Sequence, residues 1–284
     1  MQKNFSALKG KRIKIYTRSF SLEMYRYASK LFENQDAVIV RLTDQMADGY
    51  FYTIIKDTDC DIAINLDEDA FITNMDAMWD LVDFVVEKGY ANAGCSDRGA
   101  GVPRGGNPIV TNPFFNILNL ELIRIIPIDK NIINKFDYNV VKKEMVTAFP
   151  NKMLFDECDF NHYDNEPYYP FFFWMAHNFK TLYLPGRQHN DGMSTILYNH
   201  KQQPVCYHSW YARFYKMKSD HTKRINMLID EVYNIRKLPK PVFTFKDNCQ
   251  FILDLCIRWC IKIPMRIFNL PNKWKKWLRH FHDK

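Results

Sequence analysis

The chain has 284 residues, of which 47% are hydrophobic and 15% aromatic, and its formal net charge is +7. This length suits one large domain or two small ones, and this composition excludes a disordered chain. The apolar runs are all shorter than the ~18–20 residues that span a bilayer, and residues 1–6 lack the apolar core of a secretory signal. Seven cysteines without a CxxC pair argue against a disulfide framework or a structural zinc module, and predict a reducing compartment.

The net charge is concentrated at the C-terminal end. Ten of the 39 basic residues and three of the 32 acidic residues lie in residues 240–284, so residues 1–239 carry 29 of each sign. We therefore predict a neutral globular domain over residues 1–239 and a basic segment over residues 240–284. A basic surface spread over the domain would indicate nucleic acid, and its absence predicts no nucleic-acid partner.

The first ninety residues alternate between two hydrophobic patterns. Short β-branched or apolar runs at residues 12–16, 37–42 and 61–66 predict strands. Helical spacing over residues 22–32, 50–56 and 75–86 predicts three intervening helices, with Ser19 and Asn74 as N-caps and Gly89 as the stop. This alternation predicts an α/β fold with a mostly parallel sheet, in which ligands bind beyond the carboxyl ends of the strands.

The rest of the body contains weaker signals. Five of the ten glycines fall within residues 94–106, which predicts a loop with close ligand approach or unusual backbone angles. An apolar, strand-like pattern covers residues 113–122, and a further strand is expected at residues 181–184. Acidic residues and a proline at residues 164–167 predict the start of a strongly aromatic, buried helix over residues 168–178.

An acidic pair directly follows the third predicted strand. Asp67 and Asp69 are two positions apart, so their carboxylates can converge on one hard cation such as Mg²⁺ or Mn²⁺. An ordinary acidic turn is the alternative. The position beyond a buried strand of an α/β unit favours the metal site.

Residues 59–69 (DCDIAINLDED) resemble the D-x-D region of GT-A-fold glycosyltransferases. Asp164-Asn165-Glu166 before a helix resembles the acidic site of inverting members, and residues 206–210 (CYHSW) resemble the late histidine region of that fold. The resemblance covers roughly residues 11–215. It implies a GT-A-like (Rossmann-like) mostly parallel sheet flanked by helices, a UDP- or GDP-sugar donor, and Mn²⁺ or Mg²⁺ as the cofactor.

The resemblance also implies roles for individual residues. Asp69 is expected to bind the metal directly, Asp67 to reach the metal or the ribose, and His208 to bind the metal through a neutral imidazole. Asp164 or Glu166 is expected to be the catalytic base, which a retaining mechanism would not need. The alternatives are helix capping for the two acids and an ordinary hydrogen-bonded histidine beside a core tryptophan for His208.

Other polar residues receive weaker assignments, each with a solvated loop residue as the alternative. Thr17 and Arg18 after the first strand are placed near the nucleotide, and Asp44 after the second strand near its base. The glycine-rich loop is expected to hold donor sugar or phosphate through Asp97, Arg98 and Arg104. The acceptor cleft is expected to be bordered by Arg187, His189 and Asp191.

The basic segment combines two amphipathic patterns. Residues 249–263 are apolar except for Gln250 and a narrow stripe formed by Asp254, Arg258 and Lys262, and residues 272–281 alternate Trp and Phe with Lys and Arg. This pattern is typical of helices that lie in a membrane interface on anionic lipid. Helices packed on the body or in a dimer are the alternative.

Together these observations predict a metal-dependent glycosyltransferase with a C-terminal amphipathic helical tail. We expect it on the cytoplasmic face of a bacterial plasma membrane, with a lipid-linked or cell-surface glycan as acceptor. Two alternative functions stay open. A nucleotidyltransferase would have the same α/β layout and the same divalent metal, whereas a non-catalytic membrane adaptor would resemble the enzyme only in its fold and its tail.

Overall fold

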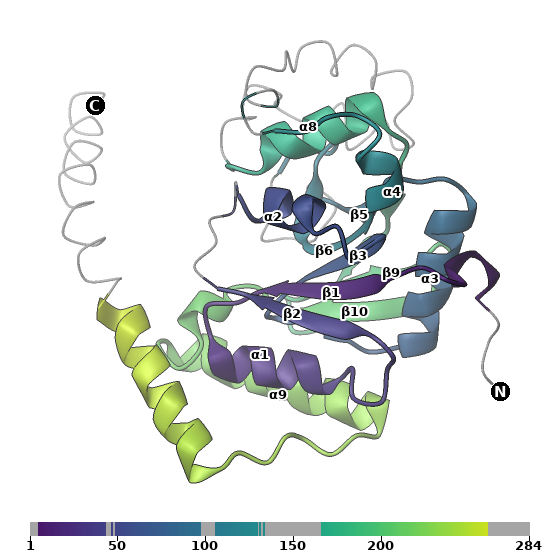
Figure 1. Cartoon of the computed structure of the whole chain (residues 1–284). Coiled ribbons are helices and arrows are strands. Elements are labelled where there is room, and N and C mark those ends of the chain that lie inside the picture. Colours follow the sequence, from purple (N-terminus) through teal and green to yellow (C-terminus); the bar gives the residue numbers. More distant parts are fainter. Residues whose placement is uncertain are drawn as a thin grey trace, which may run out of the picture.

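The computed structural model describes residues 5–43, 47, 49–97, 106–129, 131, 133 and 166–260. Its strands form two sheets, a six-stranded sheet in the order β2-β1-β3-β6-β5-β7 and a four-stranded sheet in the order β4-β10-β9-β8 (Figure 1). The strands are β1 (Ile13–Arg18), β2 (Val38–Leu42), β3 (Ile62–Asp67), β4 (Ala70–Ile72), β5 (Asn92–Ser96), β6 (Thr111–Asn119), β7 (Thr181–Leu184), β8 (Gly186–Gln188), β9 (Thr195–Tyr198) and β10 (Pro204–His208).

The six-stranded sheet is mostly parallel, as the alternating patterns predict. β1 pairs in parallel with β2 and with β3, and β5 pairs in parallel with β7. β6 runs antiparallel to its neighbours β3 and β5. Its predicted apolar run ends earlier than expected, because Asn119 caps a short helix by accepting a hydrogen bond from the backbone N–H of Leu122.

Helices flank this sheet on both faces, so the fold is mixed α/β. Asn74 caps α3 as predicted, and Gly89 follows that helix with a positive φ of 64°. Ser21 rather than Ser19 caps α1, because Ser19 is used in a contact with Glu68. The helical elements are η1 (Ser6–Leu8), α1 (Leu22–Lys30), α2 (Tyr50–Lys56), α3 (Met75–Glu87), α4 (Leu120–Ile123), α8 (Tyr169–Asn178), η3 (Ala212–Phe214), α9 (Ser219–Arg236) and a helix over residues 245–260.

Alternation along the strands divides the core into layers. Ile62, Ile64 and Leu66 of β3 face α3 and the second sheet, whereas Ala63 faces the aromatic layer of α2 and α8. In that aromatic layer Phe51 of α2 stacks on Phe171 of α8 at 4.9 Å between ring centroids. A third cluster packs α1 and α9 against the four-stranded sheet. The predicted aromatic helix is therefore core, and it begins at Tyr169, with Pro170 in its first turn.

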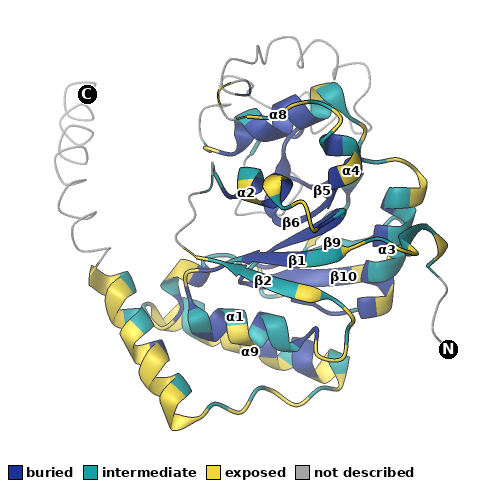
Figure 2. Cartoon of the chain, in the orientation of Figure 1, coloured by how far each residue is buried: buried dark blue, intermediate teal, exposed yellow. Residues whose placement is uncertain are grey.

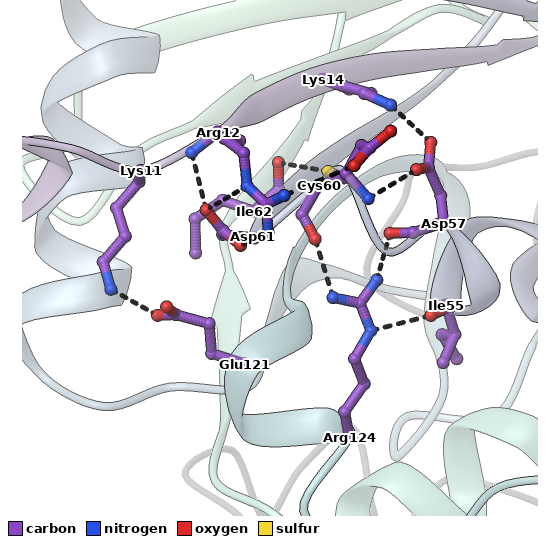
Figure 3. Close-up of polar contacts among 11 residues, drawn as sticks. Lys11, Arg12, Lys14, Ile55, Asp57, Cys60, Asp61, Ile62, Glu121 and Arg124 are labelled. Carbon is purple, nitrogen blue, oxygen red and sulfur yellow. Dashed lines mark hydrogen bonds and ion pairs between the residues drawn. The ribbon is translucent and has the colours of Figure 1, made fainter.

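A polar network closes the amino-terminal ends of β1 and β3, away from the carboxyl ends of these strands (Figure 3). Arg124, after α4, donates hydrogen bonds to the carbonyl oxygens of Ile55, Asp57 and Cys60. One guanidinium thus serves three backbone carbonyl oxygens. It links the end of α2 and the residues just before β3 to α4.

We expect Arg124→Ala to lower the free energy of unfolding by roughly 2–3 kcal/mol, because carbonyl acceptors are left without a charged donor. Urea unfolding measures this change. Lys11→Met is the matched control, since Lys11 forms a partly exposed ion pair with Glu121 in the same network, and such pairs contribute about 1 kcal/mol or less. Equal losses of unfolding free energy in the two variants would contradict the role of Arg124 as the donor to the three carbonyls.

Two aspartates of this network have depressed pKa values. Hydrogen bonds from Lys14 and Tyr16 lower the pKa of Asp57 to about 2, and hydrogen bonds from Arg12 lower the pKa of Asp61 to about 2. An unfolded aspartate has a pKa near ~3.9, so both groups stabilise the fold above that pH. This stability is lost as the pH falls from about 4 to about 2. Urea midpoints at pH 5 and pH 2.5 should show the loss, and Asp57→Asn/Asp61→Asn should reduce the difference between the two midpoints.

Candidate metal and nucleotide site

The predicted acidic pair lies where the chain passes from one sheet to the other. Asp67 is the last residue of β3 and is in register with Arg18, the last residue of β1. Glu68 and Asp69 follow, and Ala70 begins β4 in the second sheet. The turn therefore places both aspartates at the carboxyl end of the parallel strands, where α/β sheets bind ligands.

The second sheet brings His208 to the same point. His208 is the last residue of β10 and pairs with Ala70 of β4 in the antiparallel register. Its Nε2 lies 3.2 Å from Asp69 Oδ1, and Ser209 donates to Asp69 Oδ2 at 3.1 Å. The imidazole stacks on Phe114 at 4.4 Å between centroids, and the Trp210 ring contacts it from a second side at 4.2 Å. Asp69 and Ser209, which are 140 positions apart in the sequence, are in contact because β4 and β10 are neighbouring strands.

The residues present fit a divalent ion. One ligand atom from each of Asp67, Asp69 and His208 lies within 4.8 Å of the other two. The two carboxylates suit Mn²⁺ or Mg²⁺, and the imidazole adds a nitrogen ligand. His208 Nδ1 is buried and has no hydrogen-bond partner within the described part of the chain. Burial raises the pKa of Asp69, but His208 and Ser209 outweigh this effect and hold the pKa below its ordinary value. Asp69 is therefore ionised at neutral pH, as a metal ligand must be.

Glu68, between the two aspartates, has a structural role. Its carboxylate accepts hydrogen bonds from Ser19 Oγ and from the backbone N–H groups of Phe20 and Ser21. Burial raises the pKa of this carboxyl to about 7 despite these donors. Glu68 thus ties the acidic turn to the loop between β1 and α1, and Asp67 and Asp69 are the two carboxylates of the turn that could hold a metal ion with His208.

A cavity of about 320 Å³ opens over the acidic turn. Arg18 lies at its wall with Nε 4.0 Å from Asp67 Oδ1, and its guanidinium is 5.1 Å from the centre of the Tyr50 ring. Glu166 also lines the cavity, so the structure brings a further carboxylate to the acidic turn across about a hundred residues of sequence. The remaining lining includes Phe20, Asn112, Tyr168, Trp210, Tyr211 and Arg213.

Other predicted site residues lie elsewhere. Thr17 is buried within β1 and does not line the cavity. Arg187, His189 and Asp191 also lie away from its lining; His189 contacts Asp191 and Glu231. Asp97 is fully buried and accepts hydrogen bonds from Asn112, Tyr168 and Tyr169. Asn112 and Tyr168 line the cavity, so Asp97 supports its lining. Four of the predicted site residues lie outside the described residues: Asp44, Arg98, Arg104 and Asp164.

Two residues that line the cavity have unusual backbone angles, and the sequence analysis assigned no site role to either. Trp210 and Tyr211 follow the histidine and both have positive φ, 59° and 63°. Non-glycine residues adopt this left-handed region rarely and at a cost, and such strain is concentrated at functional sites. The sequence offers no glycine or asparagine here that would have indicated the turn, so only the fold reveals it.

No family model matches the chain, and a search of curated proteins finds no match. Among solved structures, the chain is similar to the mannosyltransferase PcManGT from Pyrobaculum calidifontis in complex with GDP-Man and Mn²⁺, at 10% identity and a TM-score of 0.33. That match covers 48% of this chain, which spans about half (52%) of the mannosyltransferase. The glycosyltransferase GlyE of Streptococcus pneumoniae TIGR4 matches at 14% identity and a TM-score of 0.29, over 83% of this chain and 67% of GlyE. Similarity this low assigns neither an activity nor a substrate.

Proposed function

We propose that the chain is a metal-dependent glycosyltransferase of the GT-A type, which transfers a sugar from a nucleotide-sugar donor to a hydroxyl acceptor. The observation that carries the proposal is the convergence of Asp67, Asp69 and His208 below a cavity at the carboxyl ends of β1 and β3. Two carboxylates alone would be an ordinary acidic turn. The imidazole from a different sheet makes them a ligand set.

The residues of the cavity have complementary roles in this reaction. A divalent ion at this position would supply the Lewis-acid chemistry that glycosyl transfer needs, because it would offset the negative charge of the diphosphate leaving group. Asp67, Asp69 and His208 would hold that ion. Arg18 brings a second positive charge, fixed by Tyr50 and by Asp67, to the same side of the cavity. Its guanidinium suits a phosphate oxygen.

We assign the role of the base to Glu166, because its carboxylate lines the cavity. The acceptor hydroxyl oxygen forms a bond to the anomeric carbon while the bond from that carbon to the diphosphate oxygen breaks. The hydroxyl proton passes to the Glu166 carboxylate, and the nucleoside diphosphate leaves with the electron pair. This step inverts the anomeric centre. Asp164 is the second predicted base and stays a prediction.

The test is a panel of UDP-, GDP- and CMP-sugars, each incubated with the protein with and without Mn²⁺. We expect one UDP- or GDP-sugar to raise the melting temperature only when Mn²⁺ is present, and to release free nucleoside diphosphate. Pyrophosphate released from a nucleoside triphosphate would instead indicate a nucleotidyltransferase. No Mn²⁺-dependent binding of any nucleotide would indicate a non-catalytic protein.

A further inference from the structure

The helix over residues 245–260 is oriented with its polar side toward the body. Asp247, Phe251, Asp254 and Arg258 are spaced by three or four residues, so they share one side of the helix, and all four are buried or half-buried. The predicted polar stripe of Asp254 and Arg258 therefore faces the protein. This is the reverse of a helix that covers a soluble core.

Specific contacts hold the helix in this orientation. Phe251 packs edge-on against Phe243, which packs against Tyr27 of α1. Arg258 pairs with Asp254 at 3.1 Å and donates to the carbonyl oxygen of Tyr215 at 3.4 Å. Tyr215 is two residues beyond Arg213, which lines the cavity, so Arg258 contacts the segment that borders the candidate site.

The opposite side of the helix is apolar and exposed to solvent (Figure 2). Ile252 and Leu253 are 63% and 61% exposed, and Ile257 is 52% exposed. We call this surface the outer face; it consists of Phe245, Cys249, Ile252, Leu253, Cys256, Ile257, Trp259 and Cys260. Exposed apolar patches of this kind on a protein mark an interaction surface.

Charge selects among the partners that could cover the outer face. Residues 245–260 contain two basic and two acidic residues, whereas residues 261–284 contain seven basic residues and one acidic residue. A second copy of the chain would bring another segment of net charge +6 and no opposite charge to balance the first. An anionic lipid surface attracts this charge and accepts the apolar side chains, with Trp259 suited to headgroup depth.

We propose that the outer face of the helix over residues 245–260 docks on the surface of a bilayer that contains anionic phospholipid. The helix would lie in the interface, its apolar side chains among the upper acyl chains and its polar stripe on the protein. None of the described helices is long and apolar enough to cross a membrane. The proposal is independent of the proposed function.

The experiment is cosedimentation of the full chain with vesicles of phosphatidylcholine alone or with about one-third phosphatidylglycerol. We expect binding to the anionic vesicles, weakened by salt, and at least tenfold weaker binding to the neutral ones. Leu253→Glu/Ile257→Glu should reduce binding to anionic vesicles by at least tenfold. Ile125→Glu/Met227→Glu is the matched control, because both residues are 71% exposed outside the outer face, and it should bind like the original chain.

Circular dichroism and melting curves show whether the variants keep the fold, and light scattering gives the oligomeric state. Absence of binding to anionic vesicles would overturn the proposal, and so would equal binding by the outer-face variant and the control variant. A dimer that Leu253→Glu/Ile257→Glu converts to a monomer would also overturn it, because a second copy would then cover the outer face. Release of nucleoside diphosphate in solution is measured separately and does not bear on these outcomes.

Discussion

Asp69→Asn is expected to reduce metal-dependent sugar transfer by roughly a thousandfold or more. The substitution keeps the shape of the side chain and its contact with Ser209 but removes the charge that faces His208. Charge stabilisation by a divalent ion contributes several kcal/mol in the transition state, and each ~1.4 kcal/mol is tenfold in rate. Asp67→Asn should give a loss of the same kind, because Asp67 is the second carboxylate of the ligand set.

Mn²⁺ binding and activity must be measured together to test this prediction. The electron paramagnetic resonance signal of free Mn²⁺ reports the affinity, and release of nucleoside diphosphate reports turnover. Asp59→Asn is the matched control, since Asp59 is an exposed aspartate just before the other end of β3 and pairs only with Arg12 among the described residues. Full activity and unchanged Mn²⁺ affinity in both the Asp67 and the Asp69 variants would rule out the metal site.

Arg224→Met is expected to destabilise the lining of the cavity while leaving the proposed metal ligands unchanged. Arg224 of α9 donates to the Trp210 carbonyl oxygen at 2.9 Å and to Ser194 Oγ at 2.7 Å, and lies 3.4 Å from Asp191 Oδ2. These contacts hold Trp210 in its left-handed conformation, and the Trp210 ring packs on His208. Loss of a charged donor from this half-buried network should lower the free energy of unfolding by roughly 2–3 kcal/mol.

The same variant should lower turnover by roughly ten- to a hundredfold, because a small displacement of a positioning group is costly. Lys223→Met is the matched control: it removes an exposed cation from the neighbouring position of α9. Urea unfolding and the transfer assay are run on both variants. If Arg224→Met matches Lys223→Met in both measurements, Arg224 does not position the wall of the cavity.

The Asp69 and Arg224 variants distinguish residues that are proposed to bind the metal from a residue that positions the lining of the cavity. On the proposed function, removal of a carboxylate at residue 67 or 69 should weaken metal binding and leave the fold intact. Removal of Arg224 should weaken the fold and affect the proposed metal site only through Trp210 and His208. A variant series that shows both signatures would locate the reaction at the junction of the two sheets.

Much of the parallel sheet is predictable from the sequence because its signals are local. Apolar runs at residues 12–16, 37–42 and 61–66 coincide with β1, β2 and β3, and the predicted helix at Tyr50–Lys56 has those bounds in the structure. A strand that is buried on both faces must be apolar along its length, and a helix on its surface must repeat its apolar residues at helical spacing. The position of Asp67 and Asp69 follows from these runs alone.

The second sheet could not be predicted in the same way. Its strands β4, β8, β9 and β10 contain three to five residues each, too few to show a period. Their pairing depends on contacts between distant segments, and so does the antiparallel direction of β6. Ser19 likewise fits the N-cap pattern of its neighbours in the sequence, but its hydroxyl donates to Glu68, 49 positions away.

The sequence by itself determined the order of strands and helices over residues 12–86, the acidic pair beyond β3 and the concentration of charge in residues 240–284. These features arise from neighbours along the chain, whose patterns survive without a fold. Only the tertiary structure decided that His208 faces Asp69, that Glu166 shares their cavity, and that the apolar side of the helix over residues 245–260 is exposed to solvent. Each of these depends on which distant surfaces pack together, and packing energy acts between residues that the sequence keeps far apart.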